Sequence, residues 1–377
     1  MPEREYEFGL DTFMPVSADE HGNSLSGDQI VRNTVEEGVL AEQVGIDSFN
    51  IGEHYRDDTM DSAAHVVLGA IAGRTERMRL GTSVTVLSTQ DPVRLYNNFA
   101  TLDAVSGGRA QLIVGRGSAI ESFPLFGYDL REYEEAFEEK LGLFVELLRG
   151  GPVTWTGKYR PALDGQVLTP PLPAGHLPTW VGVGGSPESV IRAARYGLPL
   201  MLAVIGGGPE RFRPLVDLYR RALAQYERPV DLPVGVHVLG YAGASDEEAV
   251  ETQLPAWLAA FDSAARERGW RRPTRDQFDA EVAHGAMFVG SPETVAQRMA
   301  AVMRALDVDR LDLHYAIGPV PFERRLETIE LLGREVFPRV RELLSVEAVS
   351  HAQVDGPSDP GDVKSPVRST HAPVTQG

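Results

Sequence analysis

Short runs of β-branched and apolar residues alternate along the chain with longer segments whose apolar residues recur every three or four positions. The short runs end in glycine or polar residues, as strands do, whereas the longer spacing is that of amphipathic helices. Leu95, Phe99 and Leu102 form one such helical stripe. The runs that we interpret as strands span residues 6–14, 48–54, 79–87, 109–115, 179–184, 198–205, 232–240 and 310–316.

This alternation predicts the fold class. Strands that alternate with helices are expected to lie parallel and to be joined by right-handed crossovers. Eight repeats in one unit favour a closed α/β barrel, the (β/α)8 TIM barrel, over an open doubly wound sheet. Two stretches exceed a minimal repeat, residues 150–176 and 269–289, and we interpret both as insertions that shape the substrate pocket. The barrel is expected to occupy residues 1–345.

The C-terminal segment has a different composition. Residues 346–377 contain no Leu, Ile or aromatic residue and include four prolines. Such a segment buries too little apolar surface to offset the entropy lost on ordering. We therefore predict a disordered tail over residues 346–377.

Composition and charge narrow the function. Among 377 residues, 54 are acidic and 36 basic, so the net charge is −18. A surface this negative repels nucleic acid and anionic lipids. The chain has no cysteine, no apolar run long enough for a membrane span, and a charged start without a signal-peptide core. We expect a cytoplasmic enzyme that acts on a small molecule, with no nucleic-acid or membrane partner.

In a barrel of this type the active site lies at the C-terminal ends of the strands. His54 follows the second predicted strand and is a candidate general acid or base, because imidazole titrates near neutrality. The alternative is a structural histidine that hydrogen-bonds across the strand end. Asp57, Asp58 and His65 are near in sequence, but no HxH or HExxH pattern is present, so we expect no metal site.

Residues 184–189, Gly-Gly-Ser-Pro-Glu-Ser, have the composition of a helix start. Ser186 fits the N-cap and Pro187 the first helical position. Glycines before a helix N-terminus let backbone N–H groups approach a phosphate. Simple capping would explain the same residues, because residues 290–294 have nearly the same pattern. We expect only the first copy to bind an anion.

Arg116 lies between Gly115 and Gly117 at the end of the fourth predicted strand. With two glycines beside it, its guanidinium group can reach into a site with little obstruction, and its fork of donors suits a phosphate. A surface role is the alternative. We interpret Arg116 as an anion-binding residue.

Several motifs resemble those of the bacterial luciferase-like flavin monooxygenases, in the family's order, from about residue 6 to 340. Glu53-His54 follows the second predicted strand, and Gly81-Thr82-Ser83-Val84 lies in the third. The other matching motifs are Asp91-Pro92-Val93-Arg94, Ser106-Gly107-Gly108-Arg109, Gly115-Arg116-Gly117, Val181-Gly182-Val183-Gly184-Gly185-Ser186 and Tyr196-Gly197-Leu198-Pro199.

The resemblance implies a barrel that binds FMN at its C-terminal face. It makes His54 the catalytic histidine and Arg116 a phosphate contact, with hydroxyl groups from Ser186 and Ser189 on the phosphate side. It also implies a non-prolyl cis peptide against the flavin ring within residues 83–85. The cofactor-binding residues expected in this way are Ser83, Val84, Thr85, Gly115, Arg116, Gly184, Gly185, Ser186 and Ser189.

The sequence departs from the family pattern at three positions. Tyr55 stands where the family usually has a second histidine, Gly115 replaces a reactive cysteine of the luciferase α-chain, and Gly185 replaces an acidic residue. The flavin site is expected to persist, but light emission is not.

The function expected from the resemblance is that of a monooxygenase or oxidoreductase that uses reduced FMN and dioxygen on a small organic substrate. NAD(P)H or a flavin reductase would supply the electrons, and we expect a homo-oligomer such as a dimer. One alternative is hydride transfer with an 8-hydroxy-5-deazaflavin cofactor. Another is a flavin-binding protein without catalytic activity, against which the retention of His54 argues.

Overall fold

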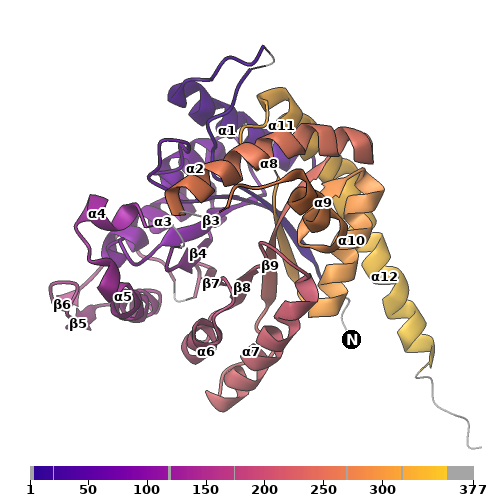
Figure 1. The fold of residues 1–377 in the computed structure, drawn as a ribbon. Coiled ribbons are helices and arrows are strands. Elements are labelled where there is room, and N and C mark those ends of the chain that lie inside the picture. Colours follow the sequence, from indigo (N-terminus) through magenta and orange to yellow (C-terminus); the bar gives the residue numbers. More distant parts are fainter. Residues whose placement is uncertain are drawn as a thin grey trace, which may run out of the picture.

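The computed structural model describes residues 4–19, 21–117, 120–173, 175–268, 271–315 and 317–354. Within them, eight parallel strands close into a ring, because β8 pairs with both β7 and β9, and β11 pairs with β1. The structure thus confirms the predicted (β/α)8 barrel (Figure 1). In ring order the strands are β1 (Glu7–Thr12), β2 (Ser48–Ile51), β3 (Arg79–Val86), β4 (Leu112–Gly115), β7 (Thr179–Val183), β8 (Leu200–Ala203), β9 (Val234–Ala242) and β11 (Arg310–His314).

Each predicted strand corresponds to one strand of the ring, with shifts at the ends. The second strand ends at Ile51, so His54 lies in the loop that follows it. The seventh strand continues to Ala242, beyond the predicted end at residue 240. The last strand ends at His314, and residue 316, where we expected it to end, lies outside the described residues.

A further parallel strand was not predicted. β10 (Met287–Gly290) begins within the insertion 269–289 and pairs with the C-terminal part of β9, from Leu239 to Ala242. Its neighbour in the same insertion is α9 (Arg275–His284). Four apolar positions after a helix are too short a run to distinguish a strand from a loop by pattern alone.

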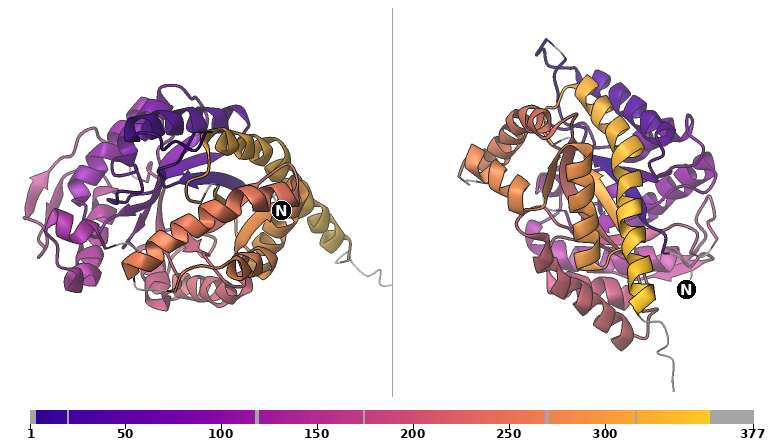
Figure 2. Two further views of the ribbon diagram at one scale, coloured as in Figure 1. Left: turned by 45° about the horizontal axis from the view of Figure 1, so that its top comes forward. Right: turned by 90° about the vertical axis from the view of Figure 1, so that its right-hand side faces the viewer.

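The remaining helices surround the barrel, as Figures 1 and 2 show. On α3 the stripe Leu95, Phe99 and Leu102 is buried, as predicted. None of the helices that the structure describes is long and apolar enough to cross a membrane. The helices are α1 (Gly27–Gln43), α2 (Ala64–Ala72), α3 (Pro92–Ser106), α4 (Ser122–Phe126), α5 (Tyr133–Leu147), α6 (Pro187–Tyr196), α7 (Arg213–Gln225), α8 (Asp246–Arg268), α10 (Pro292–Leu306), α11 (Phe322–Leu331) and α12 (Phe337–Val354).

The predicted boundary at residue 345 falls within α12. The helix continues to Val354, and residues 355–377 lie outside the described part of the chain. The tail therefore stays a prediction for these last residues.

The barrel interior is polar near the N-terminal ends of the strands. Arg310 is 1% exposed and binds both carboxylate oxygens of Asp312 at 2.8 Å. It also donates to Gln111 Oε1 at 2.9 Å and to Ser48 Oγ at 3.1 Å. Gly9 leaves room for this network, since a Cβ there would lie 2.3 Å from Asp312 Oδ1. Because removing one partner of a buried ion pair costs about 3–5 kcal/mol, the network holds the strands in one register.

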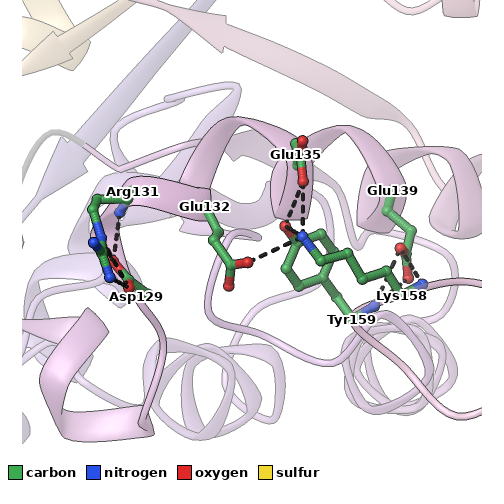
Figure 3. Close-up of polar contacts among 7 residues, drawn as sticks. All are labelled: Asp129, Arg131, Glu132, Glu135, Glu139, Lys158 and Tyr159. Atoms are coloured by element: carbon green, nitrogen blue, oxygen red, sulfur yellow. Dashed lines mark hydrogen bonds and ion pairs between the residues drawn. The ribbon is translucent and has the colours of Figure 1, made fainter.

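The insertion 150–176 forms a small hairpin, β5 (Val153–Trp155) and β6 (Leu163–Gln166), that is anchored to α5. Figure 3 shows the anchor: Lys158 Nζ contacts Glu132 and Glu135, each at 3.0 Å, and Tyr159 donates to Glu135 at 2.8 Å. Glu139 accepts from the backbone N–H of Lys158 at 2.6 Å. Single exposed ion pairs are weak, but these contacts share one loop and fix it against the helix.

Candidate active site

A cavity of about 290 Å³ opens at the C-terminal ends of the strands. A larger cavity, of about 590 Å³, lies at the opposite end of the barrel, where catalytic residues are not expected in this fold and where Arg310 of the lining pairs with Glu7. We therefore take the smaller cavity as the candidate site. Its lining residues are Phe13, Glu53, His54, Ser83, Val84, Val86, Gly115, Arg116, Gly117, Glu121, Ser122, Gly182, Val183, Gly184, Met201, Ala203, Ile205 and His237.

His54 is held by a buried carboxylate. Its Nδ1 lies 2.8 Å from Oδ2 of Asp61, and its backbone N–H donates to the other Asp61 oxygen at 3.2 Å. The Asp61 side chain is fully buried. Burial by itself lowers the pKa of His54, but the hydrogen bond and charge of Asp61, with the charge of Glu121, outweigh it and leave that pKa raised. The pair is a histidine–carboxylate dyad at the cavity wall.

Val84 forms one wall of the cavity. The peptide bond between Ser83 and Val84 is cis, where the family resemblance implied such a bond. The Val84 side chain fills the space left by two glycines. A Cβ at Gly115 or at Gly182 would lie 2.7 Å from a Val84 methyl carbon. These two glycines therefore let Val84 sit between the ends of β4 and β7.

Arg116 lies at the cavity rim and is paired with an acidic residue of α5. Its Nη1 contacts Oε1 of Glu134 and donates to the hydroxyl of Tyr133 at 3.2 Å. The other Glu134 oxygen accepts from Arg192 on α6 at 3.1 Å. Two guanidinium groups thus bind one carboxylate. A phosphate dianion in place of that carboxylate would be bound by the same two groups.

The start of α6 adjoins this cation pair. Ser186 is the N-cap, with its Oγ accepting from the Ser189 backbone N–H at 3.3 Å, and Pro187 takes the first helical position, as predicted. The Ser189 hydroxyl accepts from Arg192 Nη1 at 3.4 Å. Ser186 also donates to Glu188 at 2.8 Å. Ser291 takes the N-cap position of α10 in the second copy of the pattern, but its side chain makes no capping hydrogen bond. No such cation pair adjoins it among the contacts of the described residues.

The cavity brings together most, but not all, of the residues expected from the sequence. His54, Ser83, Val84, Gly115, Arg116 and Gly184 line it. Thr85 does not: it is buried and its hydroxyl pairs with that of Thr82 at 2.7 Å. Gly185, with a φ of +119°, leads into α6, so together with Ser186 and Ser189 it lies at the N-terminal end of that helix, next to the cavity.

Sequence reasoning missed several residues of the site. One is Asp61, which contacts His54 from seven positions further along the chain. Two others are Glu134 and Arg192, which contact each other across α5 and α6. Such contacts between side chains arise only in the folded protein. Glu121 lines the cavity, and its Oε2 is buried with no hydrogen-bond partner in the described structure. The sequence signal that could have identified Glu121 was its position in the loop after the fourth strand. Contrary to expectation, neither insertion supplies a lining residue among those described.

A second polar group lies deeper in the barrel. Asp11 of β1 lies between His237 of β9 and His314 of β11, with contact distances of 3.0 and 3.1 Å. The ring of Phe13 separates His54 from this group, because its centroid lies 4.5 Å from that of His54 and 4.4 Å from that of His314.

Comparison with known proteins finds relatives and solved structures that match most of the chain. The F420-dependent glucose-6-phosphate dehydrogenase of Rhodococcus erythropolis is 26% identical over 331 residues, which are 83% of this chain and 94% of that protein. The monooxygenase RslO1 from Streptomyces bottropensis has the same fold, with a TM-score of 0.75 at 23% identity over 88% of this chain and 99% of that one. The oxygenating constituent of 3,6-diketocamphane monooxygenase from Pseudomonas putida, solved with FMN, gives a TM-score of 0.71 at 19% identity, with coverage of 89% and 98%.

The decisive match is to a family model. The model of the luciferase-like monooxygenases matches residues 8–310, which run from the second residue of β1 to the first residue of β11. Because this match spans most of the chain, the protein belongs to the luciferase-like monooxygenase family.

Proposed function

We propose that the protein is a flavin-dependent oxidoreductase that binds FMN in the cavity and uses reduced FMN and dioxygen to oxidise a small organic substrate. The observation that carries the proposal is the placement of an apolar wall, Val84, and a cation, Arg116, on one cavity at the C-terminal end of the barrel. A flavin needs both: a flat surface for its ring and a cation for its phosphate.

The described residues fit this cofactor. Val84 and the glycines beside it present little side-chain bulk, so a planar ring can approach the strand ends. The phosphate would reach Arg116, Arg192 and the first N–H groups of α6, where the helix dipole also favours an anion. Glu134 must turn away first, and it can do so because its side chain is 45% exposed.

His54 would handle the proton that accompanies the chemistry. When bound, reduced FMN would supply the electrons that activate dioxygen. Asp61 engages Nδ1 of His54, which leaves Nε2 to hold or donate a proton at the reacting atoms. The charge of Asp61 stabilises the protonated imidazole, and the ring of Phe13 packs against it and helps to keep water away.

The source of electrons and the assembly state belong to the same proposal. Either NAD(P)H directly or a separate flavin reductase would reduce the flavin, and the active form would be a homo-oligomer. Both follow from the family resemblance.

A second candidate is hydride transfer with the deazaflavin F420. The relative from Rhodococcus erythropolis, matched over most of both chains, is named for that cofactor. The cavity and the cation pair suit either cofactor, because both carry a phosphate near the ring system. A flavin-binding protein without activity remains the third candidate, and the His54–Asp61 dyad argues against it.

Titration of the purified protein separates these candidates. We expect FMN to bind with micromolar or better affinity, with quenching of its fluorescence, and F420 to bind more weakly. Tight F420 binding without FMN binding would replace the first proposal with the second. Binding of FMN without any change in the rate at which reduced FMN reacts with dioxygen would favour the inactive flavin-binding protein.

A further inference from the structure

Three potential metal ligands from three neighbouring strands meet inside the barrel. Asp11 and His314 are register partners on β1 and β11, and His237 lies on β9, the next strand in the ring. Asp11 is fully buried, and the two histidines are 6% and 4% exposed. One nitrogen of each histidine and one carboxylate oxygen of Asp11 all lie within 4.8 Å of one another.

Hydrogen bonding explains only part of this cluster. His314 Nδ1 and Asp11 Oδ2 form a hydrogen bond at 3.1 Å. His237 Nε2 and Asp11 Oδ1 are 3.0 Å apart, yet both are buried atoms without a hydrogen-bond partner in the described structure. The two atoms are close together but are not aligned with each other. As an ion pair these atoms need a protonated His237; with Nε2 unprotonated, both atoms offer a lone pair to a third group, which removes the cost of leaving them unbonded.

Two imidazoles and one carboxylate form the ligand set that proteins use for divalent transition metals, whereas Mg²⁺ and Ca²⁺ prefer oxygen ligands alone. Two ligand atoms about 2.1 Å from one ion, at right angles, are about 3.0 Å apart. Oδ1 of Asp11 lies 3.0 Å from His237 Nε2 and Oδ2 lies 3.1 Å from His314 Nδ1, so each carboxylate oxygen has this spacing to one histidine.

We propose that Asp11, His237 and His314 bind a divalent transition-metal ion such as Fe²⁺, Mn²⁺ or Co²⁺. His237 also lines the candidate active-site cavity, so an ion held by these residues would be reached from that cavity by an oxygen donor such as water or a substrate carboxylate. This proposal departs from our expectation of no metal site, which rested on short local motifs. It is independent of the proposed flavin function.

Metal binding to the full-length protein tests the proposal. After treatment with a chelator, we expect the protein to bind about one Co²⁺ per chain in equilibrium dialysis, with millimolar Mg²⁺ unable to displace it. Bound metal should raise Tm by roughly 2 °C or more. His237→Gln and His314→Gln should each weaken Co²⁺ binding by about 100-fold or more.

The matched control is His176→Gln. His176 contacts Asp103 at 3.0 Å, so it is a histidine–aspartate pair outside the barrel interior, and its removal should leave Co²⁺ binding unchanged. Absence of stoichiometric binding of Co²⁺, Mn²⁺ and Fe²⁺ to the wild type would overturn the proposal and make the cluster a simple ion pair. So would wild-type affinity in both histidine variants.

A measurement on the wild type covers the case in which the buried variants do not fold. In crystals soaked with Co²⁺, anomalous scattering should give a peak between Asp11, His237 and His314. A peak at another place, with none in the barrel interior, would contradict the proposal as clearly as a loss of binding.

Discussion

Arg192 donates from Nη2 to Oε2 of Glu134 at 3.1 Å, while the other oxygen of the same carboxylate contacts Arg116. A carboxylate therefore bridges the two cations that the proposed cofactor phosphate needs. The ion pairs join α5 to α6 and to the loop after β4, and they compete with any phosphate for the same donors.

Removing this competing charge should strengthen FMN binding. Glu134→Gln is expected to lower the Kd for FMN about twofold to tenfold, because two partly exposed ion pairs no longer have to be broken. Riboflavin, which has no phosphate, should bind as it does to the wild type. Fluorescence titration measures both. Glu135→Gln removes the same charge one residue away, where it contacts Lys158 instead, and should change neither affinity.

Removing either cation should have the opposite effect. Arg116→Ala and Arg192→Ala should each weaken FMN binding about tenfold to a hundredfold, the loss expected for charge-assisted hydrogen bonds of about 1.5–3 kcal/mol. The affinity for riboflavin should stay the same. Arg195→Ala is the control, since Arg195 lies on the same helix as Arg192 but pairs with Glu138 of α5 and not with Glu134. An equal loss of riboflavin and FMN affinity would show that these arginines do not bind the phosphate.

Loss of the His54 imidazole should affect the reaction rather than cofactor binding. His54→Gln is expected to keep near-normal FMN affinity and to lower substrate turnover by roughly 10² to 10⁴, the usual contribution of a positioned acid or base. Stopped-flow oxidation of reduced FMN by dioxygen provides a readout before the substrate is identified. If stability and FMN affinity fall together while the oxidation rate stays unchanged, His54 has only a structural role.

The raised pKa of His54 should depend on Asp61. Asp61→Asn removes the charge and leaves burial, so the pKa of His54 should fall, which NMR titration of the imidazole can measure. In the wild type, protonated His54 adds stability below its unfolded pKa of about 6.5, and this stability is lost as the pH rises through the higher folded pKa. The stability difference between wild type and variant should therefore be larger at acidic pH. Asp58→Asn, in the same loop, is the control.

The wall formed by Val84 should be sensitive to a single methyl group. Gly182→Ala would place a Cβ 2.7 Å from Val84 Cγ1, so the Val84 side chain must move from its place in the cavity wall. We expect a loss of about 1–3 kcal/mol in the free energy of unfolding and weaker binding of FMN and riboflavin alike. At Gly184 a Cβ would meet no atom within 4 Å, so Gly184→Ala should leave Tm unchanged. Equal Tm values for the two variants would contradict this account of Val84.

Much of this protein could be predicted from the sequence because the relevant physics is local. The eight ring strands follow from runs of β-branched residues, and the cap of α6 from Ser186 and Pro187, whose preferences depend on their immediate neighbours. His54, Val84 and Arg116 could be placed at one face of the barrel because each lies within three residues of the C-terminal end of a parallel strand.

The partners of these residues could not be predicted in the same way. Closure of the barrel brings Asp11 next to His314, 303 positions away, and places Arg192 and Arg116 on one carboxylate of α5. No local pattern records such contacts, since they arise from side chains of distant segments that share a buried volume. Hydrophobic periodicity and capping thus determined the barrel and the position of its active face, whereas only tertiary packing decided which charges meet there.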